Sequence, residues 1–141
     1  MYKKILVALD NSPTDRAMFP HITELARLHR SELLLVHIAD GWAARNYTRF
    51  ELADSEEMKA DRDYLAQMVT DLSAQGLEVK AELGLGDPAI EILKIAEAQK
   101  CDLIAMTTHG HRFLNDLIYG STITQVRHQA KVPLLLVNAA K

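Results

Sequence analysis

The chain has 141 residues, of which 48% are apolar and 25% charged, a balance typical of one ordinary globular domain spanning residues 1–141. Its net charge of −3 argues against a dedicated nucleic-acid binder, because that function requires a basic surface. The single cysteine, Cys101, excludes an internal disulfide, and no stretch reaches the ~18 apolar residues of a membrane span. We therefore expect a cytoplasmic protein with neither a nucleic-acid nor a membrane partner.

The first apolar run, Ile5 to Leu9, predicts a buried strand. The pair Ser12-Pro13 then predicts a helix start, with the serine as its cap and Asp15 as an acid in the first turn. This helix is expected to reach about Arg30. Pro20 should either kink it or delay its start, because proline lacks the N–H that a helix interior needs.

The second strand is predicted at Leu33 to Ile38. It contains His37, which we interpret as a hydrogen-bonded histidine of the core or rim. The next helix has apolar positions from Met58 to Leu72 and is closed by Gly76. The acid-rich run Glu51 to Asp63 is interpreted as a solvated helix face.

The third strand, Leu77 to Leu83, alternates apolar and polar residues, so we expect it at a sheet edge with one wet face. Gly84 to Ala89 satisfies the loose dinucleotide pattern G-x-G-x-x-[G/A], but no acid follows at about 20 residues' distance, where a ribose would need one. Pro88 also removes an N–H group that a pyrophosphate would use. We interpret this segment as an ordinary strand-to-helix turn with Asp87 as the cap.

The connection from Thr108 to Thr122 is longer than the roughly 2–6 residues that such links usually take. Gly110 lets the backbone approach a bulky anion. Gly120, Ser121 and Thr122 are predicted to open a helix, whose unpaired N–H groups would favour phosphate. A plain turn at Gly110, with Ser121 or Thr122 as a plain helix cap, is the alternative.

The last two strands are predicted at Leu103 to Met106 and at Val132 to Val137, with Cys101 as an inert residue at the core edge before the first of them. Strands that alternate with helices predict an α/β fold with a parallel sheet covered on both faces, in the order 2-1-3-4-5 or 3-2-1-4-5. In either order ligands bind beyond the carboxyl ends of the strands, where Asp10 lies.

Several segments together resemble the universal stress protein family (the Usp domain) along essentially the whole chain. They are Ile5-Leu-Val-Ala-Leu-Asp10-Asn-Ser12, Leu35-Val-His-Ile38, Gly86-Asp-Pro-Ala-Ile-Glu-Ile92 and Val132-Pro-Leu-Leu-Leu-Val137. Gly110, nine residues and then Gly120-Ser121 resemble the later part of that family's ATP motif, G-x2-G-x9-G-[S/T]. The motif's first glycine falls on Thr107, which is the one departure. The resemblance implies a five-stranded parallel sheet in the order 3-2-1-4-5, adenine nucleotide alpha hydrolase-like and Rossmann-like.

The resemblance also implies a site for ATP. Ala8 and Asp10 would border the adenosine, and the backbone of Ile38 would bond the adenine edge; Asp10 would otherwise be only a turn former before Ser12. The triphosphate would lie among Thr107, Gly110, His111, Arg112, Gly120, Ser121 and Thr122. Mg²⁺ would accompany the phosphates because it neutralises them and keeps most of its waters.

A nucleotide-dependent stress-response or signalling protein is the function that the resemblance implies. The last strand, Val132 to Val137, would pair across a two-fold axis to make a homodimer. The alternative, favoured by Thr107, is a homodimeric stress-response interaction module that binds no nucleotide. No Ser-His-Asp or Cys-His spacing indicates a catalytic device, so we expect at most a weak ATPase or autophosphorylating activity.

Overall fold

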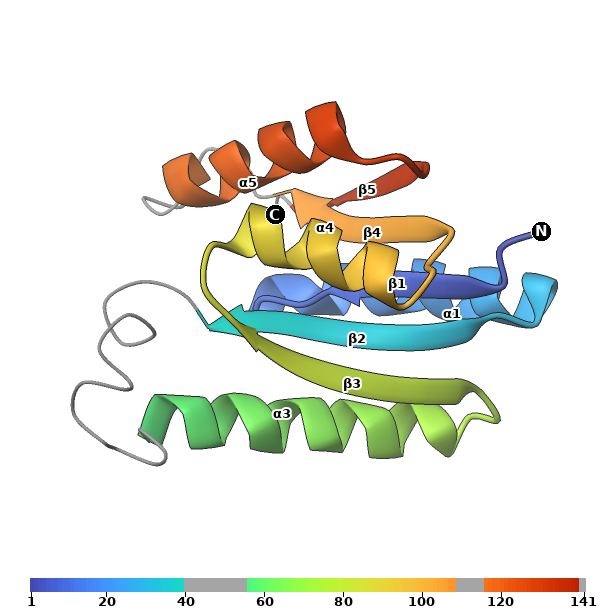
Figure 1. Cartoon of the computed structure of the whole chain (residues 1–141). Helices are drawn as coiled ribbons and strands as arrows, with labels where there is room; N and C mark the ends of the chain where they lie inside the picture. Colours follow the sequence, from blue (N-terminus) through green and yellow to red (C-terminus); the bar gives the residue numbers. More distant parts are fainter. Residues whose placement is uncertain (40–55, 109–115, 140–141) are drawn as a thin grey trace.

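The computed structural model describes residues 1–39, 56–108 and 116–139. Within them five parallel strands form one sheet in the order β3-β2-β1-β4-β5, with helices on both faces (Figure 1). The strands are β1 (Lys4–Ala8), β2 (Glu32–Ala39), β3 (Glu78–Leu85), β4 (Leu103–Thr108) and β5 (Leu134–Asn138). The helices are η1 (Pro13–Ala17), α1 (Met18–His29), α3 (Glu56–Ser73), α4 (Pro88–Ala98) and α5 (Asp116–Gln129). All five predicted strands are confirmed, in the order that the family resemblance implied.

Two apolar cores lie on opposite faces of the sheet. Helices α1 and α3 cover one face, toward which Ile5 and Val7 of β1 point. Helices α4 and α5 cover the other, toward which Leu6 and Ala8 point. We call these the α1–α3 face and the α4–α5 face. Each fully buried Val, Leu or Ile contributes about 1.5–3 kcal/mol, so the central strands hold both layers of helices.

The two edge strands differ in character. Every residue of β3 is exposed or half-buried, which confirms the predicted edge position, although exposed and half-buried residues alternate only from Glu78 to Lys80. β5 forms the opposite edge and begins at Leu134. Pro133 precedes it and, having no N–H, joins the ladder through its carbonyl, which accepts from the N–H of Ile104 at 3.1 Å.

The segment after β1 starts as a 3₁₀ helix and continues as α1. Ser12 is the cap, as predicted, and its hydroxyl accepts from the N–H of Thr14 at 3.4 Å. The α-helix begins at Met18, so that Pro20 lies in its first turn, where the missing N–H is not needed. Pro20 therefore delays the helix, the second of the two predicted outcomes.

The start of α5 corrects a prediction. Ser121 and Thr122 do not cap this helix, because it begins at Asp116 and they lie in its second turn. The hydroxyl of Thr124 donates to the carbonyl of Gly120 at 2.9 Å, a bond typical of a helix interior. The three residues between Asp116 and Gly120 include no glycine or proline, so the helix extends upstream of the hydroxyl residues. The amides from Gly120 onward are thus paired within the helix, not open at its end.

Candidate functional site

Four predicted site residues lie at the carboxyl ends of three neighbouring strands. Ala8 ends β1 and Asp10 follows it, while Ile38 and Thr107 stand one residue before the ends of β2 and β4. Because β1 pairs with both β2 and β4, these residues share one rim of the sheet. The rim that the strand pattern predicted is therefore present.

The side chains at the rim divide between the two faces of the sheet. Ala8 and Ile38 are buried in the α4–α5 core, at 4% and 8% exposure. Thr107 has 0% exposure and, by strand alternation, shares the α1–α3 face with Ala105. Its hydroxyl is buried without a hydrogen-bond partner among the described residues. The one departure from the ATP motif thus points away from the face of Ala8 and Ile38.

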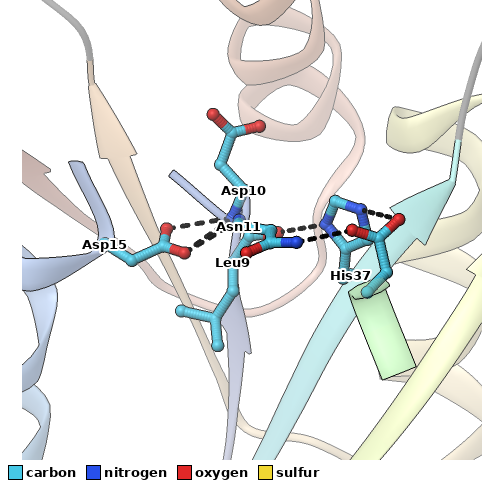
Figure 2. Close-up of polar contacts among 6 residues, drawn as sticks. Leu9, Asp10, Asn11, Asp15 and His37 are labelled. Carbon is cyan, nitrogen blue, oxygen red and sulfur yellow. Dashed lines mark hydrogen bonds and ion pairs between the residues drawn. The ribbon is translucent and has the colours of Figure 1, made fainter. Parts of the chain in front are cut away.

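The turn after β1 wraps around a buried carboxylate, that of Asp15. This carboxylate is 1% exposed and accepts from the backbone N–H of Asp10 at 2.9 and 3.2 Å and of Asn11 at 2.9 Å (Figure 2). Asn11 has a φ of 56°, a left-handed conformation that directs successive N–H groups toward one anion. Tyr64 of α3 donates its hydroxyl to the same carboxylate at 2.7 Å. The turn that carries Asp10 is therefore fixed by its own amides and by α3.

Burial is the main influence on the ionisation of this pair. It raises the pKa of Asp15, against the opposing effect of the hydrogen bonds from Asp10, Tyr64 and Asn11. Burial, and next the hydrogen bond to Asp15, also raise the pKa of Tyr64, so the phenol stays a donor.

A second buried carboxylate, that of Asp61 on α3, meets the other side of the same turn. It is 6% exposed and accepts from the side-chain amide of Asn11 at 2.7 Å. Its second oxygen lies 3.2 Å from Nε2 of His37. Nδ1 of His37 lies 2.8 Å from the carbonyl oxygen of Leu9 (Figure 2). The interpretation of His37 as a hydrogen-bonded rim histidine is confirmed.

The sequence interpretation missed the roles of both carboxylates. The prediction of a solvated helix face is wrong at Asp61, because this residue stands on the buried stripe of α3 between Met58 and Leu65. The available signal was the helical spacing, since Met58 lies three residues before Asp61 and Leu65 four residues after it. Asp15 was recognised as a first-turn acid, but nothing in the sequence indicated that it accepts from the preceding turn.

The phosphate end of the predicted site is described only in part. Three of its residues lie outside the described residues: Gly110, His111 and Arg112. In α5, Gly120 and Ser121 are exposed, whereas Thr122 is 6% exposed. A Cβ built on Gly120 would meet no atom of the described residues within 4 Å.

The glycine-rich turn before α4 has a structural role, as interpreted from the sequence. A Cβ on Gly84 would lie 2.6 Å from Cδ1 of Ile38, so the end of the Ile38 side chain would have to move for any larger residue here. Gly86 has a φ of +129°, which few other residues adopt. The carboxylate of Asp87 accepts from the N–H of Ile90 at 3.1 Å, and the start of α4 is therefore capped by the chain itself.

Three further observations concern metal binding, membrane insertion and thiol chemistry. Within the described ranges, no three His, Cys, Asp or Glu side chains are grouped closely enough to hold a metal ion. No helix in this part of the chain is long and apolar enough to cross a bilayer. Burial raises the pKa of Cys101 to about 11, which agrees with an inert thiol at the core edge.

Comparison with known proteins gives one consistent result. The Universal stress protein family model matches residues 1–138. Universal stress protein MJ0577 of Methanocaldococcus jannaschii is 29% identical, over 97% of this chain and 95% of that protein. The solved structure of MJ0577 has a TM-score of 0.81, covering 98% of this chain and 96% of the other.

Two more distant structures share the fold. One is a universal stress protein from Archaeoglobus fulgidus in complex with dAMP, with a TM-score of 0.70 at 19% identity, covering 96% of this chain and 98% of that chain. The other is a universal stress protein in complex with cAMP, with a TM-score of 0.69 at 16% identity, covering 98% of each chain. From the family match over residues 1–138, together with the sheet order, the chain belongs to the universal stress protein family.

Proposed function

We propose that this protein binds ATP with Mg²⁺ at the rim formed by the carboxyl ends of β1, β2 and β4. The bound nucleotide then controls its action as a cytoplasmic stress-response or signalling protein. Gly120 is the single observation that carries the proposal.

Nothing in the described part of the fold requires a glycine at position 120. Gly120 lies exposed in the second turn of α5, and a Cβ there would touch no atom of the described residues. A glycine inside a helix costs about 0.5–1 kcal/mol relative to alanine. A ligand lying against this turn would explain why the position is a glycine, because any side chain here would project into the space that the ligand occupies.

The geometry of the rim is compatible with an adenosine on the α4–α5 face. Ala8 is small, and Thr107 directs its branched side chain to the opposite face. Thr107 therefore presents only backbone to the proposed ligand, and the steric argument for a protein without nucleotide is weakened. Asp10, just beyond β1, is the carboxylate assigned to the adenosine.

The phosphates of the proposed ligand need partners other than unpaired amides at a helix end. Because the amides from Gly120 onward are paired within α5, we assign the phosphates to the exposed hydroxyl of Ser121 and to the segment Gly110 to Arg112. The last part of the chain is basic: residues 103–141 carry the cations Arg112, Arg127, Lys131 and Lys141 against the single acid Asp116. Arg127 and Lys131 lie in the last turn of α5 and just after it, away from the rim, so Arg112 is the cation of this group that we assign to the phosphates.

The adenine base and the metal follow from separate considerations. Proteins of this fold occur in complexes with dAMP and with cAMP, which supports an adenine nucleotide here. Mg²⁺ is usually held by phosphate oxygens, waters and one or two carboxylates. Such an ion needs no cluster of three protein ligands, so it would be held here mainly by phosphate oxygens and waters. Mg²⁺ would neutralise phosphate charge when bound.

The test is calorimetric titration of the purified protein with ATP and Mg²⁺, preceded by analysis of the denatured supernatant for adenine nucleotide. Gly120→Arg should abolish binding while leaving the fold intact, because the position is open to solvent. Gln125→Arg, which adds the same charge to an exposed position of the same helix, is the matched control and should bind like the unmodified protein. Absence of nucleotide and of titration heat in the unmodified protein would refute the proposal.

A second proposal concerns assembly. It applies equally to the alternative function, a dimeric interaction module that binds no nucleotide. β5 is a sheet edge, and its Leu136 is 40% exposed. Exposed apolar edges favour pairing with another strand. We propose a homodimer through residues 132–137. Equilibrium sedimentation should give a dimer that Leu136→Lys converts to a monomer, and a monomer before substitution would contradict the proposal.

A further inference from the structure

Asp61 and His37 belong to a chain of hydrogen bonds and close polar contacts. Neither residue is among those proposed to contact the nucleotide. These contacts run from α3 through the carboxylate of Asp61 to the side chain of Asn11 and to the ring of His37, and end at the carbonyl of Leu9. Asp61 is 6% exposed, so these bonds lie in a partly dry environment, where they are stronger than at the surface. Leu9 and Asn11, the neighbours of Asp10 in the sequence, are thus connected to α3, Asn11 directly and Leu9 through His37.

The backbone conformation at Asn11 depends on hydrogen bonds to other parts of the chain. Asn11 adopts a φ of 56°, which a residue other than glycine adopts at a cost, so the conformation depends on the hydrogen bonds that hold it. Here the side-chain amide donates to Asp61 at 2.7 Å, while the backbone N–H donates to Asp15 at 2.9 Å. Loss of the Asp61 contact would release the turn toward other conformations and move Asp10 with it.

We propose that Asp61 is a positioning residue for nucleotide binding: through Asn11 and His37 it fastens α3 to the turn that carries Asp10, so that nucleotide affinity and the docking of α3 are coupled. This inference rests on the proposed function, since Asp61 acts through Asp10 and does not itself touch the ligand. Coupling of this kind is reciprocal, so a bound nucleotide in turn holds α3 against the sheet.

Two substitutions at Asp61 separate the contact from the charge. Asp61→Ala removes both acceptor oxygens. Asp61→Asn keeps one oxygen for Asn11 and places an amide group, which can donate a hydrogen bond, beside Nε2 of His37. We expect Asp61→Ala to raise the Kd for ATP by about tenfold or more and Asp61→Asn to raise it by no more than about threefold.

Two control variants on α3 test whether a general weakening of the helix is enough to raise the Kd for ATP. Asp63→Ala removes an exposed carboxylate of the same helix. Met68→Ala removes a half-buried side chain that packs on the α1–α3 core, about two helical turns beyond Asp61. Both should bind ATP within about twofold of the unmodified protein. Equal losses in Met68→Ala and Asp61→Ala, or unchanged binding in Asp61→Ala, would overturn the inference.

Amide hydrogen exchange gives a readout that needs no ligand. The amides of Asp10 and Asn11 donate to Asp15, not to Asp61. Faster exchange of these two amides in Asp61→Ala, by about tenfold, with no change in Met68→Ala, is expected. If the unmodified protein binds no ATP, the proposed function and the coupling to nucleotide both fail, while this exchange still decides whether Asp61 fastens the turn to α3. Unchanged exchange in Asp61→Ala would overturn it.

Discussion

Replacing Asp15 with alanine is the most informative test of the turn that carries Asp10. The carboxylate accepts hydrogen bonds from two backbone N–H groups, those of Asp10 and Asn11, and from the hydroxyl of Tyr64. Each buried donor left without a partner costs about 1–3 kcal/mol. Asp10 and Asn11 are only half-buried, so water partly replaces the lost acceptor, and removal of a buried charge offsets part of the loss.

We therefore expect Asp15→Ala to lower the free energy of unfolding by about 2–4 kcal/mol. For a chain of this size the melting temperature should fall by about 10 °C. Urea denaturation monitored by circular dichroism measures the first quantity and calorimetry the second. A loss below about 0.5 kcal/mol, which is typical of a surface substitution, would refute the reasoning.

Asp15→Asn is the control that keeps an acceptor and removes the charge. Burial raises the pKa of Asp15 above its ordinary value of 3.8, so at intermediate pH the folded protein holds a proton that the unfolded chain has released. The stability of the unmodified protein relative to Asp15→Asn should therefore fall as the pH rises from 3.8 through the raised pKa, and stay constant above it. Denaturation of both proteins at a series of pH values would contradict this if the unmodified protein gained relative stability with pH.

Three further substitutions follow from the backbone. Gly120→Ala should stabilise the protein by about 0.5–1 kcal/mol in urea denaturation, because the position is helical and open; a loss of stability would contradict the assignment of Gly120 as dispensable for the fold. Gly84→Ala should destabilise it by about 1–3 kcal/mol in the same assay, because the new Cβ would lie 2.6 Å from Cδ1 of Ile38; a neutral result would mean that the Ile38 side chain moves aside freely. At Asn11, with a φ of 56°, alanine should be less stable than glycine by about 1–2 kcal/mol, and equal stabilities would argue against a left-handed turn.

Most of the fold could be predicted from the sequence because it depends on short-range patterns. The continuous apolar runs marked the central strands, and the alternation in residues 77–83 marked an edge strand. Ser12 and Asp87 marked helix starts correctly because each is followed by a proline, which cannot continue an upstream helix.

The start of α5 shows where such patterns fail. Ser121 and Thr122 resemble a cap, but no proline follows them and nothing upstream prevents the helix from starting at Asp116. The prediction of an open amide end beyond Gly120 was therefore wrong, although the exposed glycine itself remains the main support for a ligand.

The polar contacts around Asp10 could not be predicted because they join distant parts of the chain. Asn11 and Asp61 are separated by 50 positions, and Asp15 and Tyr64 by 49. Helical periodicity places Asp61 on the buried side of α3, but only the packing of α3 against the sheet decides which turn it meets.

The central claim is that an adenine nucleotide lies over the rim and against the second turn of α5. Titration of the ¹⁵N-labelled protein with ATP and Mg²⁺, followed by amide chemical shifts, tests this claim most directly. The account predicts the largest shift changes at Asp10, Ile38 and Gly120, and their absence in Gly120→Arg. Saturation with ATP that leaves these three amides unmoved, or that shifts the turn at Gly86 and Asp87 instead, would contradict it.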